Sequence, residues 1–290
     1  MTSQHRTKAW SSLALVAFVV VAAGGAFLLG KRQAEGPNEQ VAPPARGLPA
    51  TPDYHSLYVD AANTRHLLLG THVGMYESRD GGITWKTGSL GGQDAMNIVR
   101  TPDGRLWVAG HNVLSRSDDN GRTWSDVRPD GLPNLDLHGF ASDQRGCLFA
   151  AATGDGLYMS TDRGETFSEV SDEVGGSVYG LSALDGGRLL AADPGRGVLL
   201  SDDDGKTWRV ALSAPVIRLG AHSNVVLATG ERIWRSENGG EEWKAGFEPG
   251  TTFEPVAWST SEPGVAFAIT PETRTLYRSD DAGNTWAPVR

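Results

Sequence analysis

The chain of 290 residues carries a formal net charge of −9, with 39% hydrophobic and 21% charged side chains, 37 glycines and 15 prolines. This composition is typical of a turn-rich globular protein with one large domain or two small ones. From residue 33 onward there are 22 basic and 35 acidic side chains. A body of that charge repels phosphate backbones, which argues against a general nucleic-acid-binding protein.

The first segment of the chain is a candidate membrane helix. Residues 9–30 carry no charge and have basic residues on both sides, and as a helix they extend roughly 33 Å, enough to cross a bilayer core. Ala22 and Ala23 resemble a signal-peptide cleavage site, but the apolar run continues beyond them, which favours an uncleaved signal anchor. The positive-inside bias then predicts a single-pass cell-membrane protein, with residues 1–8 as a short cytoplasmic tail and an extracytoplasmic body.

Residues 31–52 form a predicted linker, with five prolines between positions 37 and 52 and almost no large apolar side chain. Such a segment buries no core and behaves as a semi-extended spacer. The globular part is therefore expected to span residues 53–290. Its single cysteine, Cys147, lies in an apolar run and is expected to be a small buried side chain, because one cysteine forms no internal disulfide.

Within residues 53–290 an eight-residue motif recurs six times at intervals of 35 to 43 residues. Most copies have a serine, an aspartate two positions later, then a glycine, a threonine and a final aromatic residue. The copies are Ser78 to Trp85, Ser117 to Trp124, Ser160 to Phe167, Ser201 to Trp208, Ser236 to Trp243 and Ser279 to Trp286. A period near 40 residues indicates repeated supersecondary units.

Between successive motifs lie short runs rich in β-branched and aromatic residues, separated by Gly, Pro, Asp and Asn, with no helical period. Four such runs per repeat predict one four-stranded antiparallel blade. Six repeats of about 40 residues predict an all-β fold, a six-bladed β-propeller. The motif then falls in the turn between the third and fourth strands of each blade.

The residues of the motif are expected to hold this turn together. The glycines supply a positive φ; they are Gly82, Gly121, Gly164, Gly205, Gly240 and Gly283. The residues two positions earlier accept backbone N–H groups across the turn, with the threonine hydroxyl as a further local partner; they are Asp80, Asp119, Asp162, Asp203, Asn238 and Asp281. The aromatic residues pack against a neighbouring blade; they are Trp85, Trp124, Phe167, Trp208, Trp243 and Trp286. The motif is therefore interpreted as a fold signature.

This pattern, S-x-D-x-G-x-T-W, resembles the Asp-box (BNR) repeat of sialidases and related propellers. Box five departs from it, with Asn238 for the aspartate and Glu242 for the threonine. The stretches "THVGMYESRDGGITW" and "LPNLDLHGFA" resemble bacterial, membrane-associated BNR-repeat proteins described as glycosyl-hydrolase-like. The body is also similar to photosystem II assembly-factor-type propellers. The first resemblance implies a glycosidase, and the second implies a non-enzymatic binding protein.

The order of strands in a propeller places function on the face opposite the boxes, where first strands begin and second strands turn into third strands. Four of the seven histidines fall on this face, in blades one to three: His55, His72, His111 and His138. Asp136 and Tyr179 lie at the starts of first strands there. Acidic turns follow in blades three to six, with Asp155, Asp193, Glu231 and Glu272.

Clustered imidazoles beside carboxylates are donors that zinc, copper or iron requires. The candidate metal or ligand residues are His55, His72, His111, His138, Asp136, Tyr179 and Asp193. A polar channel lined by hydrogen-bonded histidines is the alternative, because no H-x-H or H-x₃-H spacing defines a metal geometry. The same residues also suit a small organic ligand or a protein partner.

Enzymatic readings find less support in the residues. Sialidase chemistry, as the resemblance implies it, uses an arginine trio and an R-I-P motif; the sequence has no such motif, and only Arg196 and Arg218 lie near the mouth. Other glycosidases need two carboxylates about 5–10 Å apart, which the acidic turns offer but which a solvated surface also displays. The preferred hypothesis is a membrane-anchored extracytoplasmic binding or assembly module with no catalytic residues identified, and a glycosidase is the alternative.

Overall fold

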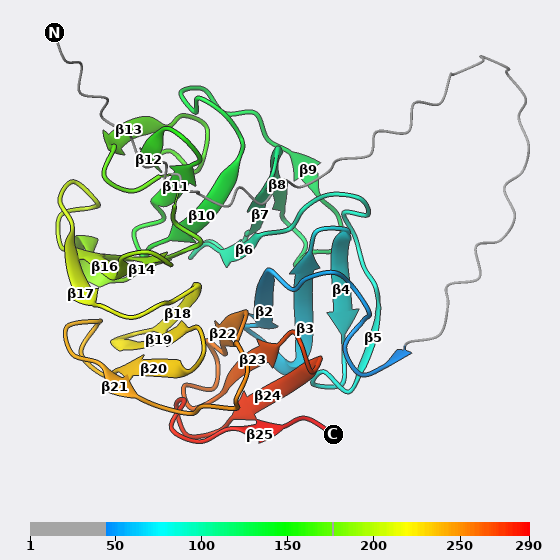
Figure 1. Cartoon of the computed structure of the whole chain (residues 1–290). Helices are drawn as coiled ribbons and strands as arrows, with labels where there is room; N and C mark the ends of the chain where they lie inside the picture. The colour runs from blue at the N-terminus through cyan, green and yellow to red at the C-terminus, as the bar shows by residue number, and fades with distance from the viewer. Residues whose placement is uncertain (1–44, 176) are drawn as a thin grey trace, which may run out of the picture. The chain divides into compact units, whose positions relative to one another are not determined.

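The computed structural model of the protein describes residues 45–175 and 177–290. Its strands form six antiparallel sheets arranged radially around a central axis, as Figure 1 shows. The predicted all-β, six-bladed propeller is therefore confirmed. The membrane helix predicted over residues 9–30 and most of the predicted linker lie outside the described residues. Within the described ranges, no helix has the length and apolar character needed to span a bilayer.

Each blade takes four consecutive strands, counted from the axis outward. Blades one to three comprise β2 (Ser56–Asp60), β3 (Asn63–Thr71), β4 (Gly74–Ser78) and β5 (Thr84–Thr87); β6 (Asn97–Arg100), β7 (Leu106–Gly110), β8 (Val113–Ser117) and β9 (Ser125–Asp126); and β10 (Leu137–Ser142), β11 (Leu148–Ala152), β12 (Gly156–Ser160) and β13 (Ser168–Ser171). Blades four to six comprise β14 (Gly180–Ala183), β15 (Leu189–Asp193), β16 (Gly197–Ser201) and β17 (Arg209–Leu212); β18 (Arg218–His222), β19 (Val225–Thr229), β20 (Ile233–Ser236) and β21 (Lys244–Ala245); and β22 (Val256–Trp258), β23 (Ala266–Thr270), β24 (Thr275–Ser279) and β25 (Ala287–Pro288). A short 3-10 turn, η1 (Asp185–Gly187), joins β14 to β15.

The ring closes by packing of the last blade against the first. The innermost strands contact one another in chain order, and β22 contacts β2. Leu57 and Leu67 of the first blade share a buried cluster with Phe267 and Ile269 of the last blade. Each of these two blades has its four radial strands from one continuous segment. Closure therefore depends on apolar side chains, and within residues 45–175 and 177–290 no strand is shared between the first and last blades.

The first blade carries one further edge strand, β1 (Ala45–Arg46), which pairs with β5. These two residues fall in the linker predicted over residues 31–52, and in the structure they pair with the propeller instead. The amide of Gly47 donates to the carbonyl of Ile83 at 2.9 Å, and the hydroxyl of Tyr54 donates to the carbonyl of Pro49 at 2.6 Å. Ala45 and Arg46 both have backbone N–H groups, so they can pair at the edge of the sheet.

All six Asp boxes form the turn between the third and fourth strands, as predicted. In each box the serine oxygen accepts the glycine amide at 2.8–2.9 Å, and the six glycines have φ between +82° and +91°. In five boxes the aspartate accepts both the amide and the hydroxyl of the threonine. In box five the Asn238 side-chain oxygen accepts the amide of Glu242 at 2.9 Å, so asparagine keeps the backbone contact.

The aromatic residue of each box lies in the gap toward a neighbouring blade. Trp85 is 2% exposed, packs in the cluster shared with the last blade, and donates its indole N–H to the carbonyl of Gly82 at 3.0 Å. Phe167 is buried without such a donor. Cys147 is a buried free thiol, as predicted, and burial raises its pKa. The boxes thus join turn geometry to packing between blades.

Candidate functional site

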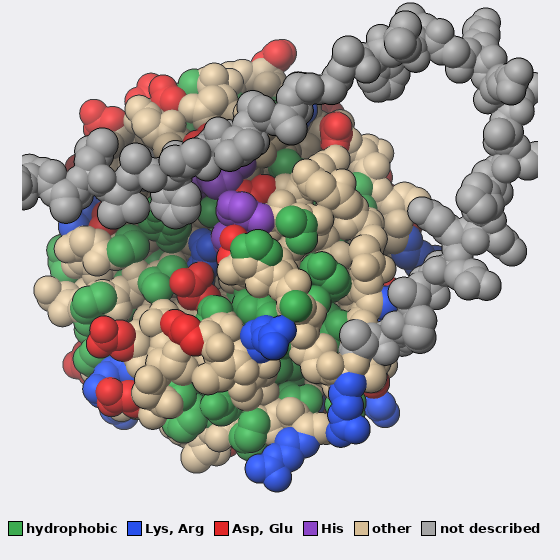
Figure 2. Space-filling view, turned by 45° about the vertical axis from the view of Figure 1, so that its right-hand side comes forward, with side chains coloured by type: hydrophobic (Ala, Val, Ile, Leu, Met, Phe, Trp, Pro, Cys, Tyr) green, Lys and Arg blue, Asp and Glu red, His purple; other side chains and the backbone are tan. Residues whose placement is uncertain are grey.

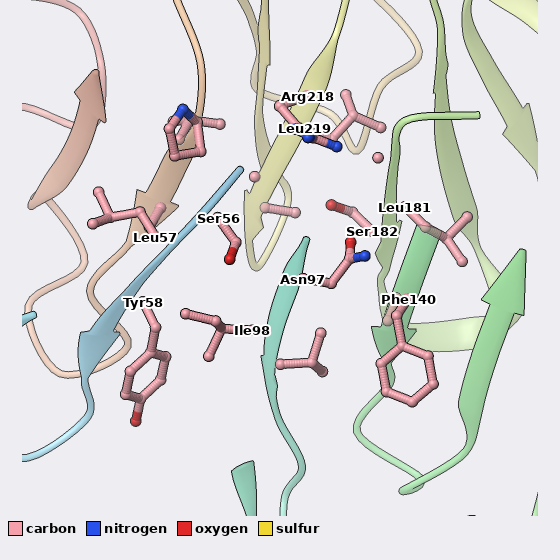
Figure 3. Close-up of a pocket in the computed structure, with 18 of the residues that line it drawn as sticks. Ser56, Leu57, Tyr58, Asn97, Ile98, Phe140, Leu181, Ser182, Arg218 and Leu219 are labelled. Carbon is pink, nitrogen blue, oxygen red and sulfur yellow. The ribbon is translucent and has the colours of Figure 1, made fainter. Parts of the chain in front are cut away.

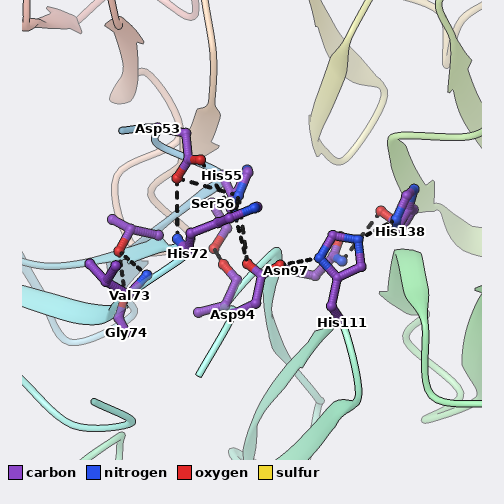
Figure 4. A network of polar contacts seen from close by, with 12 residues as sticks. Asp53, His55, Ser56, His72, Val73, Gly74, Asp94, Asn97, His111 and His138 are labelled. Atoms are coloured by element: carbon purple, nitrogen blue, oxygen red, sulfur yellow. Dashed lines mark hydrogen bonds and ion pairs between the residues drawn. The ribbon is translucent and has the colours of Figure 1, made fainter. Parts of the chain in front are cut away.

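The four predicted histidines lie side by side on one face of the ring. His55 precedes β2, His72 lies in the β3–β4 turn, His111 lies in the β7–β8 turn and His138 lies in β10. Neighbouring ring centroids are 4.5, 5.8 and 4.9 Å apart in that order. Figure 4 shows these side chains next to one another, on blades one to three. We refer to the four side chains as the histidine row.

Tyr179 continues the histidine row toward blade four. Its ring centroid lies 5.2 Å from that of His138, and the residue is 37% exposed. Backbone contacts fix the positions of the row, since the amide of His55 donates to the carbonyl of Gly70 at 2.9 Å. An isolated β-bridge joins His111 to Asp136 across the gap between blades. Propeller register therefore brings together residues that are far apart in sequence.

Three carboxylates lie along the row. Asp94 Oδ2 lies 2.5 Å from His111 Nδ1, and Asp94 Oδ1 lies 3.4 Å from His72 Nδ1. Asp136 Oδ1 lies 3.4 Å from His111 Nε2 and 3.3 Å from His138 Nε2. Asp53 lies 3.4 Å from His55 Nε2.

Asp53 and Asp94 were absent from the predicted site. An alignment of the repeats carries the signal for them, because an aspartate stands two residues before His55, Met96 and His138 alike.

A buried arginine sits next to the row. Arg218 is 6% exposed, and its guanidinium donates to the carbonyl of Tyr179 and, at 3.4 Å, to Nδ1 of His55. Burial, followed by the charge of Arg218, lowers the pKa of His55 to about 3. Burial also lowers the pKa of His138. Both imidazoles are therefore neutral near pH 7 and offer a nitrogen lone pair.

The row stands at the mouth of the central channel. A cavity of about 240 Å³ is lined by the innermost strands of all six blades, and Figure 3 shows Ser56, Asn97, Ser182 and Arg218 reaching into it among apolar side chains. A second pocket of about 480 Å³ lies beside the row and includes His72, Asp94, His111 and Arg128. Figure 2 shows histidine and acidic side chains together in a hollow of the visible face.

Three of the four predicted acidic turn residues are engaged in other contacts. Asp193 is 2% exposed and accepts hydrogen bonds from Arg196 at 2.7 Å and Ser177 at 2.8 Å, as well as from the amide of Gly195. None of its hydrogen bonds reaches a histidine, so it holds its own turn. Asp155 accepts from Asn134 at 2.8 Å, and Glu272 accepts from Thr251 at 2.5 Å.

The mouth offers donor sets for a cation. Ligand atoms lie within 4.8 Å of one another in three sets: Asp53, His55 and His72; His72, Asp94 and His111; and His111, Asp136 and His138. Asp94 Oδ1, Asp136 Oδ1 and His138 Nδ1 are buried and have no hydrogen-bond partner among the described residues. A buried polar atom without a partner costs about 1–3 kcal/mol. The arrangement is therefore suited to a metal ion or a polar ligand.

Comparison with known proteins gives a family match over nearly the whole propeller. The sequence model of the family described as Photosynthesis system II assembly factor YCF48 matches residues 51–288. No curated protein matches the chain. YCF48 from Cyanidioschyzon merolae is 19% identical, with a TM-score of 0.54, covering 86% of this chain and 88% of that one. A structure described as YCF48 bound to D1 peptide gives the same identity and TM-score, with 86% and 85% coverage.

The fold is also similar to that of a larger enzyme. A GH74 xyloglucanase from Xanthomonas campestris is 20% identical, with a TM-score of 0.58 over 86% of this chain. The chain spans only 46% of the length of that enzyme. At such identities, the solved structures show a shared propeller fold alone.

Proposed function

This chain belongs to the family of the photosystem II assembly factor YCF48, and on that premise we propose that it is a binding or assembly module that holds a protein partner at the mouth of its channel. The structure described as YCF48 bound to D1 peptide supports a peptide segment as the kind of ligand for the family. The proposal concerns the face that carries the histidine row.

The observation that carries the proposal is the pair of exposed apolar side chains on this face. Val73 is 47% exposed in the β3–β4 turn, next to His72, and Tyr179 is 37% exposed beside His138. Among the described residues, Val210 is the only other large hydrophobic side chain exposed to this degree. Tyrosine is enriched at protein interfaces, where its ring packs against the partner and its hydroxyl stays hydrogen-bonded.

The contacts of the carboxylates favour binding over hydrolysis. A glycosidase uses two carboxyl groups about 5–10 Å apart, one as a proton donor and the other as a base or nucleophile. Asp94 and Asp136 lie against imidazoles, and Asp193 is paired with Arg196. Asp94 and Asp193 are therefore engaged in hydrogen bonds that hold the mouth and its turns.

Site-specific crosslinking tests the proposal. A photoreactive phenylalanine analogue at Tyr179 is expected to crosslink a partner protein in cells. The same analogue at Val210, which is 53% exposed on the outer strand β17, is the matched control. Equal crosslinking from both positions, or none from Tyr179, contradicts a partner at the mouth. A D1 peptide is the first purified probe, with Tyr179→Ala expected to weaken any binding at least tenfold.

We also propose that residues 9–30 anchor the protein in the cell membrane and that the propeller lies on the extracytoplasmic side. The uncharged run and its basic flanks support this placement. Protease added outside intact spheroplasts is expected to digest the propeller, and alkaline carbonate is expected to leave the chain in the membrane fraction. Protection from the protease, or release by carbonate, contradicts the proposal.

A further inference from the structure

We infer that His111, Asp136 and His138 form a binding site for one divalent transition ion of the zinc class, and that Asp94 orients His111 within it. The inference goes beyond partner binding and does not depend on it. It rests on four points: the spacing of three donor atoms, the contact of Asp94 with His111, the unpaired carboxylate oxygen of Asp136, and the contrast with the donor set around His55.

The three donor atoms form a triangle with one short side. Nε2 of His111 lies 2.9 Å from Nε2 of His138, and Oδ1 of Asp136 lies 3.4 and 3.3 Å from these two nitrogens. A tetrahedral zinc ion with bonds of about 2.0–2.2 Å separates its ligand atoms by roughly 3.3–3.5 Å. Two sides of the triangle therefore match an edge of such a tetrahedron, and the two imidazole nitrogens have to separate by about 0.5 Å to match the third. Three protein ligands leave one coordination position for solvent or for a donor from a bound molecule.

Asp94 sets the tautomer that a metal ligand needs. Its carboxylate oxygen lies 2.5 Å from Nδ1 of His111, and an ionised carboxylate only accepts hydrogen bonds. Nδ1 of His111 therefore carries the proton, and its Nε2 accepts the hydrogen of Nε2 of His138 at 2.9 Å. An ion between the two rings requires the proton of His138 to move to its Nδ1, which has no hydrogen-bond partner in the described part of the chain. A carboxylate behind a histidine ligand is the usual support of a protein-bound metal. Asp94 is 8% exposed, so packing holds it in place.

The charges at the triangle favour a cation. Asp136 Oδ1 is buried without a hydrogen-bond partner in the described part of the chain, although the imidazoles of His111 and His138 lie beside it. Asp94 adds a second negative charge within 2.5 Å of His111. A divalent ion would satisfy the orphan oxygen and balance both carboxylates.

The donor set around His55 fits a metal less well. Arg218 donates to Nδ1 of His55 at 3.4 Å, and a guanidinium has no acceptor. His55 must then carry its proton on Nε2, which donates to Nδ1 of His72. Both nitrogens of His55 are occupied, and the charge of Arg218 repels a cation. We therefore assign this part of the histidine row to hydrogen bonding.

Zinc titration of the chelator-treated full chain tests the assignment. Calorimetry and elemental analysis after dialysis are expected to show one zinc ion per chain in the wild type. His138→Gln and Asp136→Asn are expected to lose at least 100-fold in zinc affinity. Asp94→Asn is expected to lose about 10–100-fold, because it disturbs His111 without removing a ligand. Cobalt in place of zinc should give the intense visible absorption of a tetrahedral site.

Two matched variants separate this site from its neighbours. His55→Gln and His222→Gln are expected to keep wild-type zinc affinity and stoichiometry, with His222 in β18 as the control for loss of a histidine elsewhere. Near-ultraviolet circular dichroism confirms that each variant is folded. A wild type that binds no zinc, a His138→Gln variant that binds as the wild type does, or an equal loss in His55→Gln would overturn the inference.

Discussion

The side-chain oxygen of Ser78 accepts the amide hydrogen of Gly82 at 2.8 Å, and the equivalent pair recurs in all six Asp boxes. Both groups are buried at this position, and Ser78 is 1% exposed. We expect Ser78→Ala to lower the free energy of unfolding by about 1–3 kcal/mol, because the Gly82 amide loses its partner. Thr84→Val, which removes only the hydroxyl contact with Asp80, should cost less. Urea unfolding of the two variants measures both free energies of unfolding, and an equal decrease in the two would contradict this prediction.

A second prediction concerns Gly197, which opens β16 with φ of +103°. A Cβ at this position would lie 1.9 Å from the carbonyl oxygen of Leu212. Gly146 has φ of +83°, and a Cβ built there would meet no atom within 4 Å. Gly146→Ala therefore measures only the cost of a left-handed backbone for a residue with a Cβ, about 1–2 kcal/mol. Gly197→Ala is expected to cost clearly more, seen as a lower melting temperature. Equal melting temperatures would show that the close approach is relieved at no cost.

The Asp boxes predict how stability changes in acid. Hydrogen bonds from the threonines, with those from Thr123 to Asp119 as the example, lower the pKa of Asp119, Asp162 and Asp203 to about 2. Unfolded aspartates titrate near 4, so the unfolded chain binds more protons between these values. The stabilisation is therefore fully present above about pH 4 and is lost as the pH falls toward 2. Carboxylate titration by NMR checks this, with Thr123→Val expected to raise the pKa of Asp119 and leave that of Asp203 unchanged.

Removing the buried arginine should change the protonation of the mouth. Burial and the charge of Arg218 together hold the pKa of His55 near 3. In Arg218→Met, at low metal concentration, we expect the pKa of His55 to rise while staying below its ordinary value, because burial persists. Arg196→Met is the control, since Arg196 pairs with Asp193. Imidazole titration by NMR reads the result, and an unchanged His55 in Arg218→Met would contradict the electrostatic coupling.

The fold was predictable because six copies of one turn specify six hairpins at a constant spacing. The serine, aspartate and glycine of each copy all act within eight residues, so their roles follow from local chemistry. The clustering of His55, His72, His111 and His138 was also predictable, because strand order assigns each of them to one face.

The remaining features of the site depend on details that local patterns do not contain. Asp53 and Asp94 enter the row through the common register of the first strands, which becomes visible only when the repeats are aligned. Asp193 lies in a turn on the same face, but its carboxylate accepts a hydrogen bond from Arg196, three residues later, instead of joining the row. The edge strand β1 depends on pairing with Thr84 and Trp85, nearly forty residues away. Such long-range pairings follow from the assembled ring.

In the described part of the chain, the first and last blades share no strand, and in this their junction is like the five other junctions of the ring. The ring can therefore be assembled from a chain that begins at any of the six blades. A circularly permuted chain that begins at the third blade should assemble the same disc, provided that a tether joins the former ends.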